Sequence, residues 1–368
     1  MVFQLLSLDE DTLHEHIFER YVELERNSAN LKQDLGIQSR TGTTIEIDIE
    51  PPLLTTATKT IRKKKKNKVK QNGSRTDIEL YNVVVEQSLS DLNSSVSNNN
   101  STTGYVLWSS TPFFLRWLLY NDESEPLRHP SESIKVVNID QDMIKIPPIY
   151  SEINDTKVGI IELGTGISPL MAVILSNHVD YYICTDQRGI LNKLKQNIKE
   201  NISQISRREC ISKSLEIKRS EIQIEYESDT IESNENKKRY NRASKTSTVS
   251  IEVEELDWEK FDISVNHPYL NQIRDDCDTI YIIAMDVIYN EYLIEPFLNT
   301  ITNLRKYLSK NTKGTAVIQE VKCLIGVHLR SQDIVTEFLE QAIINHELPV
   351  YSISDSSLDA SRYAFYLI

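Results

Sequence analysis

At 368 residues the chain is long enough to bury a sizeable core, and its formal charge of −13 argues against non-specific nucleic-acid binding, which needs an excess of Lys and Arg. The 26% charged and 39% hydrophobic residues describe an ordinary globular protein and exclude a wholly disordered chain. No run of about 18 apolar residues occurs, so we expect no membrane-spanning helix.

The start of the chain and its cysteines indicate the cellular compartment. The opening MVFQLLSLDEDTLHEH lacks a positively charged start and soon turns acidic, so it is a poor secretion signal. The cysteines are scattered, without a Cys-x-x-Cys pair, at Cys184, Cys210, Cys277 and Cys323. This usage is typical of a reduced, intracellular protein, so we expect a cytoplasmic location. We expect no metal site, because His14 and His16 do not share a helix face.

The first hundred residues predict a small N-terminal extension with β structure. Apolar side chains at helical spacing predict a helix within residues 9–27. Residues 44–49 alternate as a half-buried strand does, and residues 80–85 predict a second strand. An Asn/Ser-rich loop follows around residues 94–101. We therefore divide the chain near residue 100, into an extension over 1–100 and a main domain over 101–368.

The basic run RKKKKNKVK at residues 62–70 separates the two strands of the extension. One interpretation is a solvated, disordered loop. The other is a nuclear signal, or a contact to RNA or to an acidic surface. Apart from this run, we expect no stable nucleic-acid binding.

The main domain alternates predicted strands and helices. A continuous apolar run at 158–163 is typical of a strand buried on both faces of a parallel sheet. Further strands are predicted at 179–185, 279–285 and 323–329, and helices after Ser168-Pro169 and at 189–201, 293–308 and 331–345. A polar, charge-mixed insertion at 218–247 is expected to be disordered.

Two strands close the chain, at 350–353 and 363–368, with no long helix between them. Alternating β and α elements that end in a β–β pair indicate a mostly parallel sheet with one antiparallel strand, covered by helices. We therefore predict an α/β protein with a Rossmann-like sheet.

The first chemical signal is a glycine loop after the strand at 158–163. It reads Glu162-Leu163-Gly164-Thr165-Gly166 and opens a helix. The two glycines permit a tight turn and let backbone N–H groups approach a ligand. An ordinary strand-to-helix turn explains the pattern equally well when it is taken alone.

A second signal is Asp186, at the end of the next strand. An acidic residue about 20 residues after such glycines can accept hydrogen bonds from both ribose hydroxyls of a nucleoside. Dinucleotide enzymes and methyltransferases share this pairing, so it indicates an adenosine-type cofactor without saying which. The alternative interpretation is a helix-capping Asp.

Two features separate these candidates. The loop continues with Ser168 and lacks the third glycine of a dinucleotide fingerprint, and Glu162 leads the loop. The glutamate-led pattern resembles motif I of methyltransferases. The terminal β–β pair agrees, because an NAD enzyme would continue with further parallel βα units.

Three further segments make the resemblance specific: TGYVLW at 103–108, LDW at 256–258 and MDVIY at 285–289. Together they resemble the family-16 protein lysine methyltransferases, whose D-x-x-Y motif follows strand four. HLRSQ and the C-terminal FYLI extend the likeness over nearly the whole chain. The resemblance implies a seven-strand methyltransferase sheet, S-adenosylmethionine as methyl donor, a lysine side chain as acceptor, and a large-subunit ribosomal protein as substrate.

The same resemblance assigns the site residues. Those implied to bind the cofactor are Trp108, Glu162, Gly164, Thr165, Gly166, Asp186, Trp258 and Met285. Among them, the glycine loop would lie beside the methionine part and Asp186 would hold the ribose. Trp258 would pack on the adenine, Met285 would line the adenine or methyl side, and Trp108 would close over the cofactor. Indole faces favour both a purine and a sulfonium cation. For Trp108, the alternative is a core or lid aromatic.

Asp286 and Tyr289 are the implied catalytic residues on the acceptor side. Methyl transfer from a sulfonium to an amine needs alignment and a neutral amine more than a strong base. A carboxylate and a phenol at the carboxyl end of a strand supply alignment. The alternative is a strand-end turn with Tyr289 in the core.

Other functions stay open at this point. The chain lacks the N/D-P-P-Y/F tetrapeptide of methyltransferases that act on base amines, which favours a protein acceptor by resemblance. An RNA or small-molecule methyltransferase is the second hypothesis. The third is a catalytically idle, ribosome-binding module of the same fold. No coiled-coil pattern occurs, and we expect a monomer.

Overall fold

The computed structural model describes residues 3–28, 36–51, 80–92, 103–120, 134–138, 143–146, 156–218, 247–309, 320–354 and 356–368. The basic run at 62–70 and the Asn/Ser-rich loop around 94–101 lie outside the described residues. So does the expected insertion, except for its two end residues, 218 and 247.

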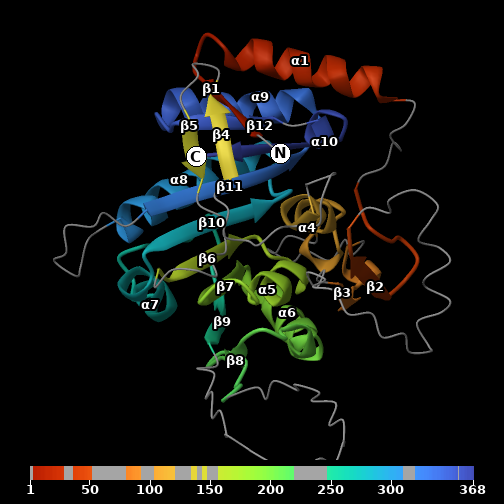
Figure 1. Cartoon of the computed structure of the whole chain (residues 1–368), viewed down its shortest axis with the longest axis vertical. Coiled ribbons are helices and arrows are strands. Elements are labelled where there is room, and N and C mark those ends of the chain that lie inside the picture. Colours follow the sequence, from red (N-terminus) through yellow and green to blue (C-terminus); the bar gives the residue numbers. More distant parts are fainter. Residues whose placement is uncertain are drawn as a thin grey trace, which may run out of the picture.

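Seven neighbouring strands form the centre of one large sheet (Figure 1). In spatial order they are β9 (Thr248–Glu255), β7 (Tyr181–Asp186), β6 (Val158–Leu163), β10 (Thr279–Met285), β11 (Glu320–His328), β13 (Tyr363–Leu367) and β12 (Val350–Ser354). All neighbours from β9 to β11 pair in parallel, whereas β13 is antiparallel to both β11 and β12. This arrangement confirms the predicted Rossmann-like, mostly parallel sheet with one antiparallel strand.

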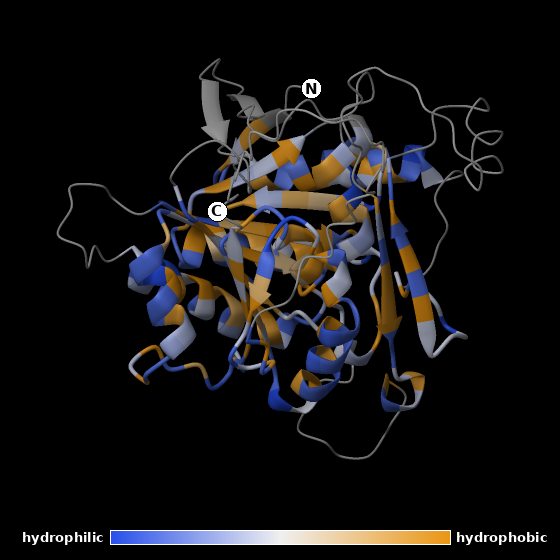
Figure 2. Ribbon diagram, turned by 60° about the horizontal axis from the view of Figure 1, so that its bottom comes forward, coloured by the Kyte–Doolittle hydropathy of each residue, from blue (hydrophilic) through white to orange (hydrophobic). Residues whose placement is uncertain are grey.

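Burial explains why the central strands could be read from the sequence. Every residue of β6 is buried, and all but the first of β10, as expected for strands covered on both faces. Figure 2 shows hydrophobic residues concentrated in the middle of the sheet and hydrophilic ones on the outer helix surfaces.

Additional strands widen the sheet at both ends. At one edge β1 (Phe3–Leu8) pairs antiparallel with β12, and β4 (Ile134–Asn138) and β5 (Met143–Ile146) follow it. At the other edge β8 (Glu209–Ile211) lies beside β9. A strand at 3–8 is not among the predicted elements, because so short an apolar run has no decisive period. The expected division near residue 100 therefore does not separate β1 from the sheet of the main domain.

Helices cover both faces of the sheet. On one face lie α4 (Ser110–Tyr120), α5 (Leu170–Leu175), α6 (Arg188–Glu200) and the hairpin of β2 (Thr44–Ile49) and β3 (Tyr81–Glu86). On the other lie α1 (Leu13–Arg26), α7 (Pro268–Asp276), α8 (Glu291–Leu308) and α9 (Gln332–Glu340), with α1 against α9 (Figure 1). Short elements are α3 (Leu89–Leu92), α10 (Ser356–Asp359), 3-10 turns at Thr103–Tyr105 and Ile202–Gln204, and a π-helical turn at Gln341–Asn345.

The predicted strands of the N-terminal extension form a hairpin that is fastened to α6. The side-chain amide oxygens of Asn197 and Asn201 accept the backbone N–H groups of Glu86 and Val84, at 3.1 and 2.9 Å. Their amide NH₂ groups donate back to the carbonyls of the same two residues, at 3.0 and 2.7 Å. These amides satisfy the edge of β3 as a further strand would.

No helix in the described part of the chain combines the length and the apolar character needed to cross a bilayer.

Candidate functional site

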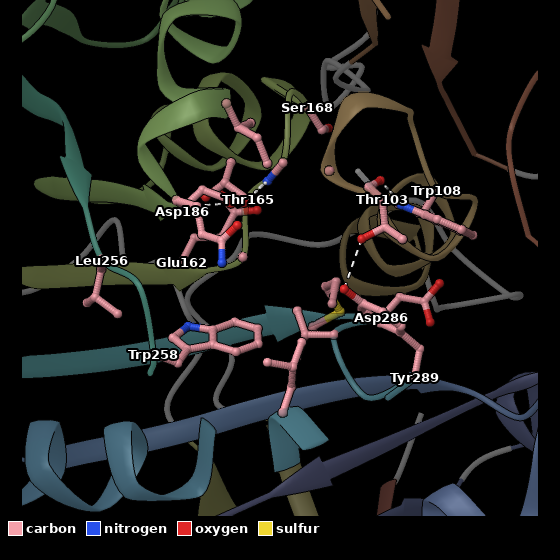
Figure 3. A pocket seen from close by; sticks show the side chains of 18 of the residues that line it. Thr103, Trp108, Glu162, Thr165, Ser168, Asp186, Leu256, Trp258, Asp286 and Tyr289 are labelled. Atoms are coloured by element: carbon pink, nitrogen blue, oxygen red, sulfur yellow. Dashed lines mark hydrogen bonds between the residues drawn. The ribbon is translucent and has the colours of Figure 1, made fainter. Parts of the chain in front are cut away.

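A cavity whose empty space, open solvent included, is about 840 Å³ opens at the carboxyl ends of β6, β7 and β10, the edge at which open α/β sheets bind ligands. All ten residues that the sequence assigns to a site line it: Trp108, Glu162, Gly164, Thr165, Gly166, Asp186, Trp258, Met285, Asp286 and Tyr289. Figure 3 shows Asp186, Glu162 and Trp258 at one end of this cavity, and Thr103, Trp108 and Tyr289 at the other.

The glycine loop after β6 adopts a backbone that other residues rarely accept. Gly164 and Gly166 have φ angles of +69° and +61°. A Cβ on Gly164 would stand 2.8 Å from Val287, and one on Gly166 would stand 3.0 Å from the carbonyl oxygen of Gly104. Both glycines are therefore required by backbone conformation and by space.

Asp186 ends β7 and points at this loop. Its two carboxylate oxygens accept the backbone N–H groups of Gly166 and Gln187, each at 2.7 Å. Burial raises the pKa of Asp186 to about 6, although the two N–H groups act in the opposite direction. A carboxylate offers about four acceptor positions, so each oxygen can accept one further hydroxyl from the cavity.

Glu162 lies at the end of β6 and is 3% exposed. The Tyr182 hydroxyl donates to its carboxylate at 2.6 Å. Burial raises the pKa of Glu162 to about 8 despite this bond. The Thr185 hydroxyl donates to the backbone carbonyl of Glu162 at 2.7 Å, and the Thr165 N–H donates to the carbonyl of Thr185 at 3.0 Å. The loop is thus tied to β7 at several points.

Trp258 and Met285 form the apolar wall of the cavity. The Trp258 indole packs edge-on against Phe297 of α8, with ring centroids 5.0 Å apart, and the partly buried residue lines the cavity. Met285 is buried, and its sulfur fills the space that a Cβ on Gly326 would occupy. A flat apolar ring opposite the part-buried Asp186 carboxylate suits a nucleoside, whose base is apolar on its faces and whose ribose carries hydroxyls.

At the opposite end, the segment at 103–108 meets the segment at 286–289. The hydroxyls of Thr103 and Tyr289 share a hydrogen bond of 2.9 Å, and the Trp108 indole N–H donates to the carbonyl of Thr103 at 2.9 Å. Tyr289 is 37% exposed, so it lies at the rim of the cavity and not in the core.

The Asp286 carboxylate is already paired with a cation, whereas its predicted role is to align a lysine. Its φ is +62° and its side chain is 1% exposed. Both carboxylate oxygens already accept from the Arg330 guanidinium, at 2.8 and 2.5 Å. Arg330 also lies over the Trp108 ring, 5.0 Å from its centroid. Any group that reaches Asp286 from the cavity therefore meets a carboxylate with a resident cation.

Sequence reasoning missed Arg330, although it falls within the HLRSQ segment. The available signal was indirect: a carboxylate expected at the end of a buried strand needs a compensating partner. Thr103 was quoted only as part of the TGYVLW segment, and no pattern links it to Tyr289.

Comparison with known proteins identifies the chain more closely. The ribosomal lysine N-methyltransferase 5 of Saccharomyces cerevisiae strain AWRI796 is 44% identical over 380 residues, covering 100% of both chains. The protein of the same name from strain ATCC 204508 / S288c is 43% identical over the same coverage. No protein-family model matches.

Among solved structures, that of human methyltransferase 10 domain containing protein overlays 59% of this chain and 72% of its own. Its TM-score of 0.28 and identity of 11% are too low to bear on the fold. The full-length identity to the yeast proteins is decisive by itself: the chain belongs to the ribosomal lysine N-methyltransferase 5 family.

Proposed function

We propose that this protein transfers a methyl group from S-adenosylmethionine to a lysine side chain of a large-subunit ribosomal protein. The observation that carries the proposal is one continuous cavity that joins the part-buried Asp186 carboxylate and an indole at one end to the rim of Tyr289, Thr103 and Trp108 at the other. The name shared by the yeast relatives, together with full-length coverage, supports lysine as the acceptor and the ribosome as the source of the substrate.

The residues present fit the donor. Asp186 would accept the ribose hydroxyls on the lone pairs that its two N–H donors leave available. Trp258 and Met285 would pack against the adenine, and the loop at Gly164–Gly166 would lie beside the methionine part. When bound, S-adenosylmethionine supplies a methyl carbon on a positively charged sulfur.

Glu162 fits the same end of the cavity as a polar anchor. Its pKa near 8 keeps much of it protonated at neutral pH, so it can donate a hydrogen bond as well as accept that of Tyr182. Its carboxyl group would face the amino-acid part of the donor, where both kinds of hydrogen-bonding group occur.

On the acceptor side, the lysine nitrogen must arrive as a neutral amine in line with the methyl carbon. The new N–C bond forms as the C–S bond breaks. The electron pair of that bond stays on sulfur, and the proton lost from nitrogen leaves to water. Tyr289 and Asp286 would align the amine, while Trp108 and Thr103 would limit the access of water at the rim.

The test uses purified protein, labelled S-adenosylmethionine and an extract from cells that lack this gene. Label on a lysine of one large-subunit protein, mapped by mass spectrometry, supports the proposal. Label in RNA or in a small molecule would instead support an RNA or small-molecule methyltransferase. Cofactor binding without any transfer would support an idle ribosome-binding module.

A cytoplasmic site of action and a monomeric state stay predictions. Fluorescent tagging in cells and light scattering on the purified protein test them.

A further inference from the structure

The Asp286–Arg330 pair has a geometry that an ordinary surface ion pair lacks. The carboxylate is 1% exposed and the guanidinium 22%, and two parallel hydrogen bonds of 2.8 and 2.5 Å join them. Such two-pronged pairing fixes the orientation of a carboxylate as well as compensating its charge. The backbone of Asp286 is also tied down, because its N–H donates to the carbonyl of Gly326 at 2.7 Å.

Arg330 is itself held from two further sides. The Trp108 ring lies 5.0 Å from its guanidinium carbon. Gly36, at φ +83°, packs so closely that a Cβ there would stand 3.0 Å from an Arg330 nitrogen and 2.6 Å from the His328 ring. The carbonyl of Gly36 also accepts the N–H of Ser109 at 2.7 Å, which joins this turn to the segment that carries Trp108. The N-terminal extension thus helps to hold Arg330 behind the cavity wall.

We propose that Arg330 is a positioning residue for the acceptor lysine: it fixes the Asp286 carboxylate and offsets its charge, so that the incoming side chain is received as an amine and not trapped as an ammonium ion. This inference rests on the proposed lysine methyl transfer at the same cavity.

The Arg330 charge acts on the ground state, in which the lysine is bound but has not yet reacted. A bare buried carboxylate would bind the ammonium form tightly, and that form has no lone pair with which to attack the methyl carbon. A resident guanidinium weakens this trap, because opposite charges at hydrogen-bond distance largely cancel at the position of a third group. Burial raises the pKa of Asp286, and the Arg330 charge lowers it, so Arg330 also helps to keep Asp286 ionised.

Other titratable groups surround the pair. On the elements packed against it they are His328, Tyr363 and Tyr289, and lining the cavity they are Glu162, Asp186, Asp257 and Glu259. All of these stay in place when Arg330 alone is replaced. A change in the pH profile between wild type and an Arg330 variant therefore reports on the Asp286–Arg330 pair and the lysine beside it.

The experiment compares the wild type with Arg330→Met and Arg330→Lys, as full-length chains acting on the identified lysine substrate. The rate constant kcat, the KM for substrate and the Kd for S-adenosylmethionine are measured from about pH 6 to about pH 10. Arg330→Met removes both charged hydrogen bonds to Asp286. We expect it to lose about tenfold or more in kcat at pH 7, since even one such bond is worth about a factor of ten, while its cofactor Kd stays within about twofold. Its kcat should recover as the pH rises, because the trapped lysine ammonium then loses its proton and becomes the reactive amine.

Arg330→Lys keeps the positive charge but loses the two-pronged hydrogen bonding of the guanidinium. Its kcat should therefore rise over the same pH range as that of the wild type and level off at a lower maximum. It also covers the case in which Arg330→Met does not fold. A loss of kcat in Arg330→Met that is independent of pH would overturn the charge-offset role, and so would an alkaline shift in Arg330→Lys.

A matched control is Arg208→Met, which removes another partly buried Arg–Asp pair, that of Arg208 with Asp180 at 2.7 Å. That pair lies at the amino end of β7, at the edge of the sheet opposite the cavity. It should lower stability and leave the pH profile unchanged. Absence of lysine methylation in the wild type would overturn the proposed function itself, an outcome that is distinct from a failed Arg330 prediction.

Discussion

The carboxylate of Asp186 accepts the backbone N–H of Gly166 at 2.7 Å, which ties the end of β7 to the glycine loop that follows β6. One residue thereby shapes the loop and faces the cavity. The second oxygen of Asp186 accepts the N–H of Gln187 at the start of α6. The geometry of the loop and the capacity to bind a ribose therefore depend on the same charge.

Replacing Asp186 with Asn should weaken S-adenosylmethionine binding by about 1.5–3 kcal/mol, the usual worth of a charge-assisted hydrogen bond. Asn keeps one acceptor oxygen, so the loop should survive better than with Ala. Titration calorimetry measures the change. Asp180→Asn is the control, because Asp180 also accepts a backbone N–H, that of Val158 at 3.0 Å, but at the far end of β7. Equal affinities for wild type and Asp186→Asn would remove the ribose assignment.

Trp258→Ala should lower cofactor affinity by about 1–3 kcal/mol, the range for stacking of a base on an aromatic ring. Trp117→Phe serves as the control, because Trp117 packs on Phe114 and Phe365 in the core and does not line the cavity. It should cost stability and leave the Kd unchanged. Fluorescence titration distinguishes them further, since cofactor quenching should stay unchanged in the Trp117 variant and fall in the Trp258 variant, where Trp108 is the remaining indole at the cavity. Persistent quenching there would mean that another indole reports the cofactor.

The central sheet could be predicted because its signals are local. The strand at 158–163 coincides with β6, and that at 279–285 with β10, since each is a run of apolar residues bounded by polar ones. By contrast, α4 was missed. Its residues are buried on several sides, so it shows no amphipathic period. The position of β1 beside β12 depends on a pairing across almost the whole chain, which no local pattern contains.

The residues that line the site could be predicted from the sequence, whereas the contacts between them could not. All ten residues assigned from the sequence lie around one cavity, because parallel strands bring their carboxyl ends to one edge. What the sequence could not supply is the set of contacts between them. The Arg330 partner of Asp286 and the Thr103 partner of Tyr289 are 44 and 186 residues away along the chain. Only the folded arrangement reveals that the Asp286 carboxylate carries its own cation.

Gly36→Ala should destabilise the protein by about 1–2 kcal/mol, because Gly36 has a φ of +83° and its missing Cβ leaves room for His328 and Arg330. Since Arg330 must shift to make room, kcat should fall while the cofactor Kd stays close to that of the wild type. Gly189→Ala is the contrasting variant: Gly189 is exposed in the first turn of α6, where alanine should be neutral or stabilising by about 0.5–1 kcal/mol. Urea unfolding measures the free energy of unfolding of both variants. A Gly36→Ala protein as stable as the wild type would contradict the packing argument.

The raised pKa of Glu162, about 8 against an ordinary 4.5, makes the stability of the unliganded protein depend on pH. The folded state holds this proton more tightly than the unfolded state does. The contribution of Glu162 to the free energy of unfolding is therefore complete below about pH 4.5. It is lost as the pH rises through 8, by up to about 1.4 kcal/mol per pH unit. Glu162→Gln cannot ionise and still accepts the Tyr182 hydroxyl, so its free energy of unfolding should fall less between pH 6 and pH 8. Asp186 titrates in both proteins and cancels in the comparison. Parallel pH dependences in urea unfolding would show that Glu162 stays ionised in the folded protein.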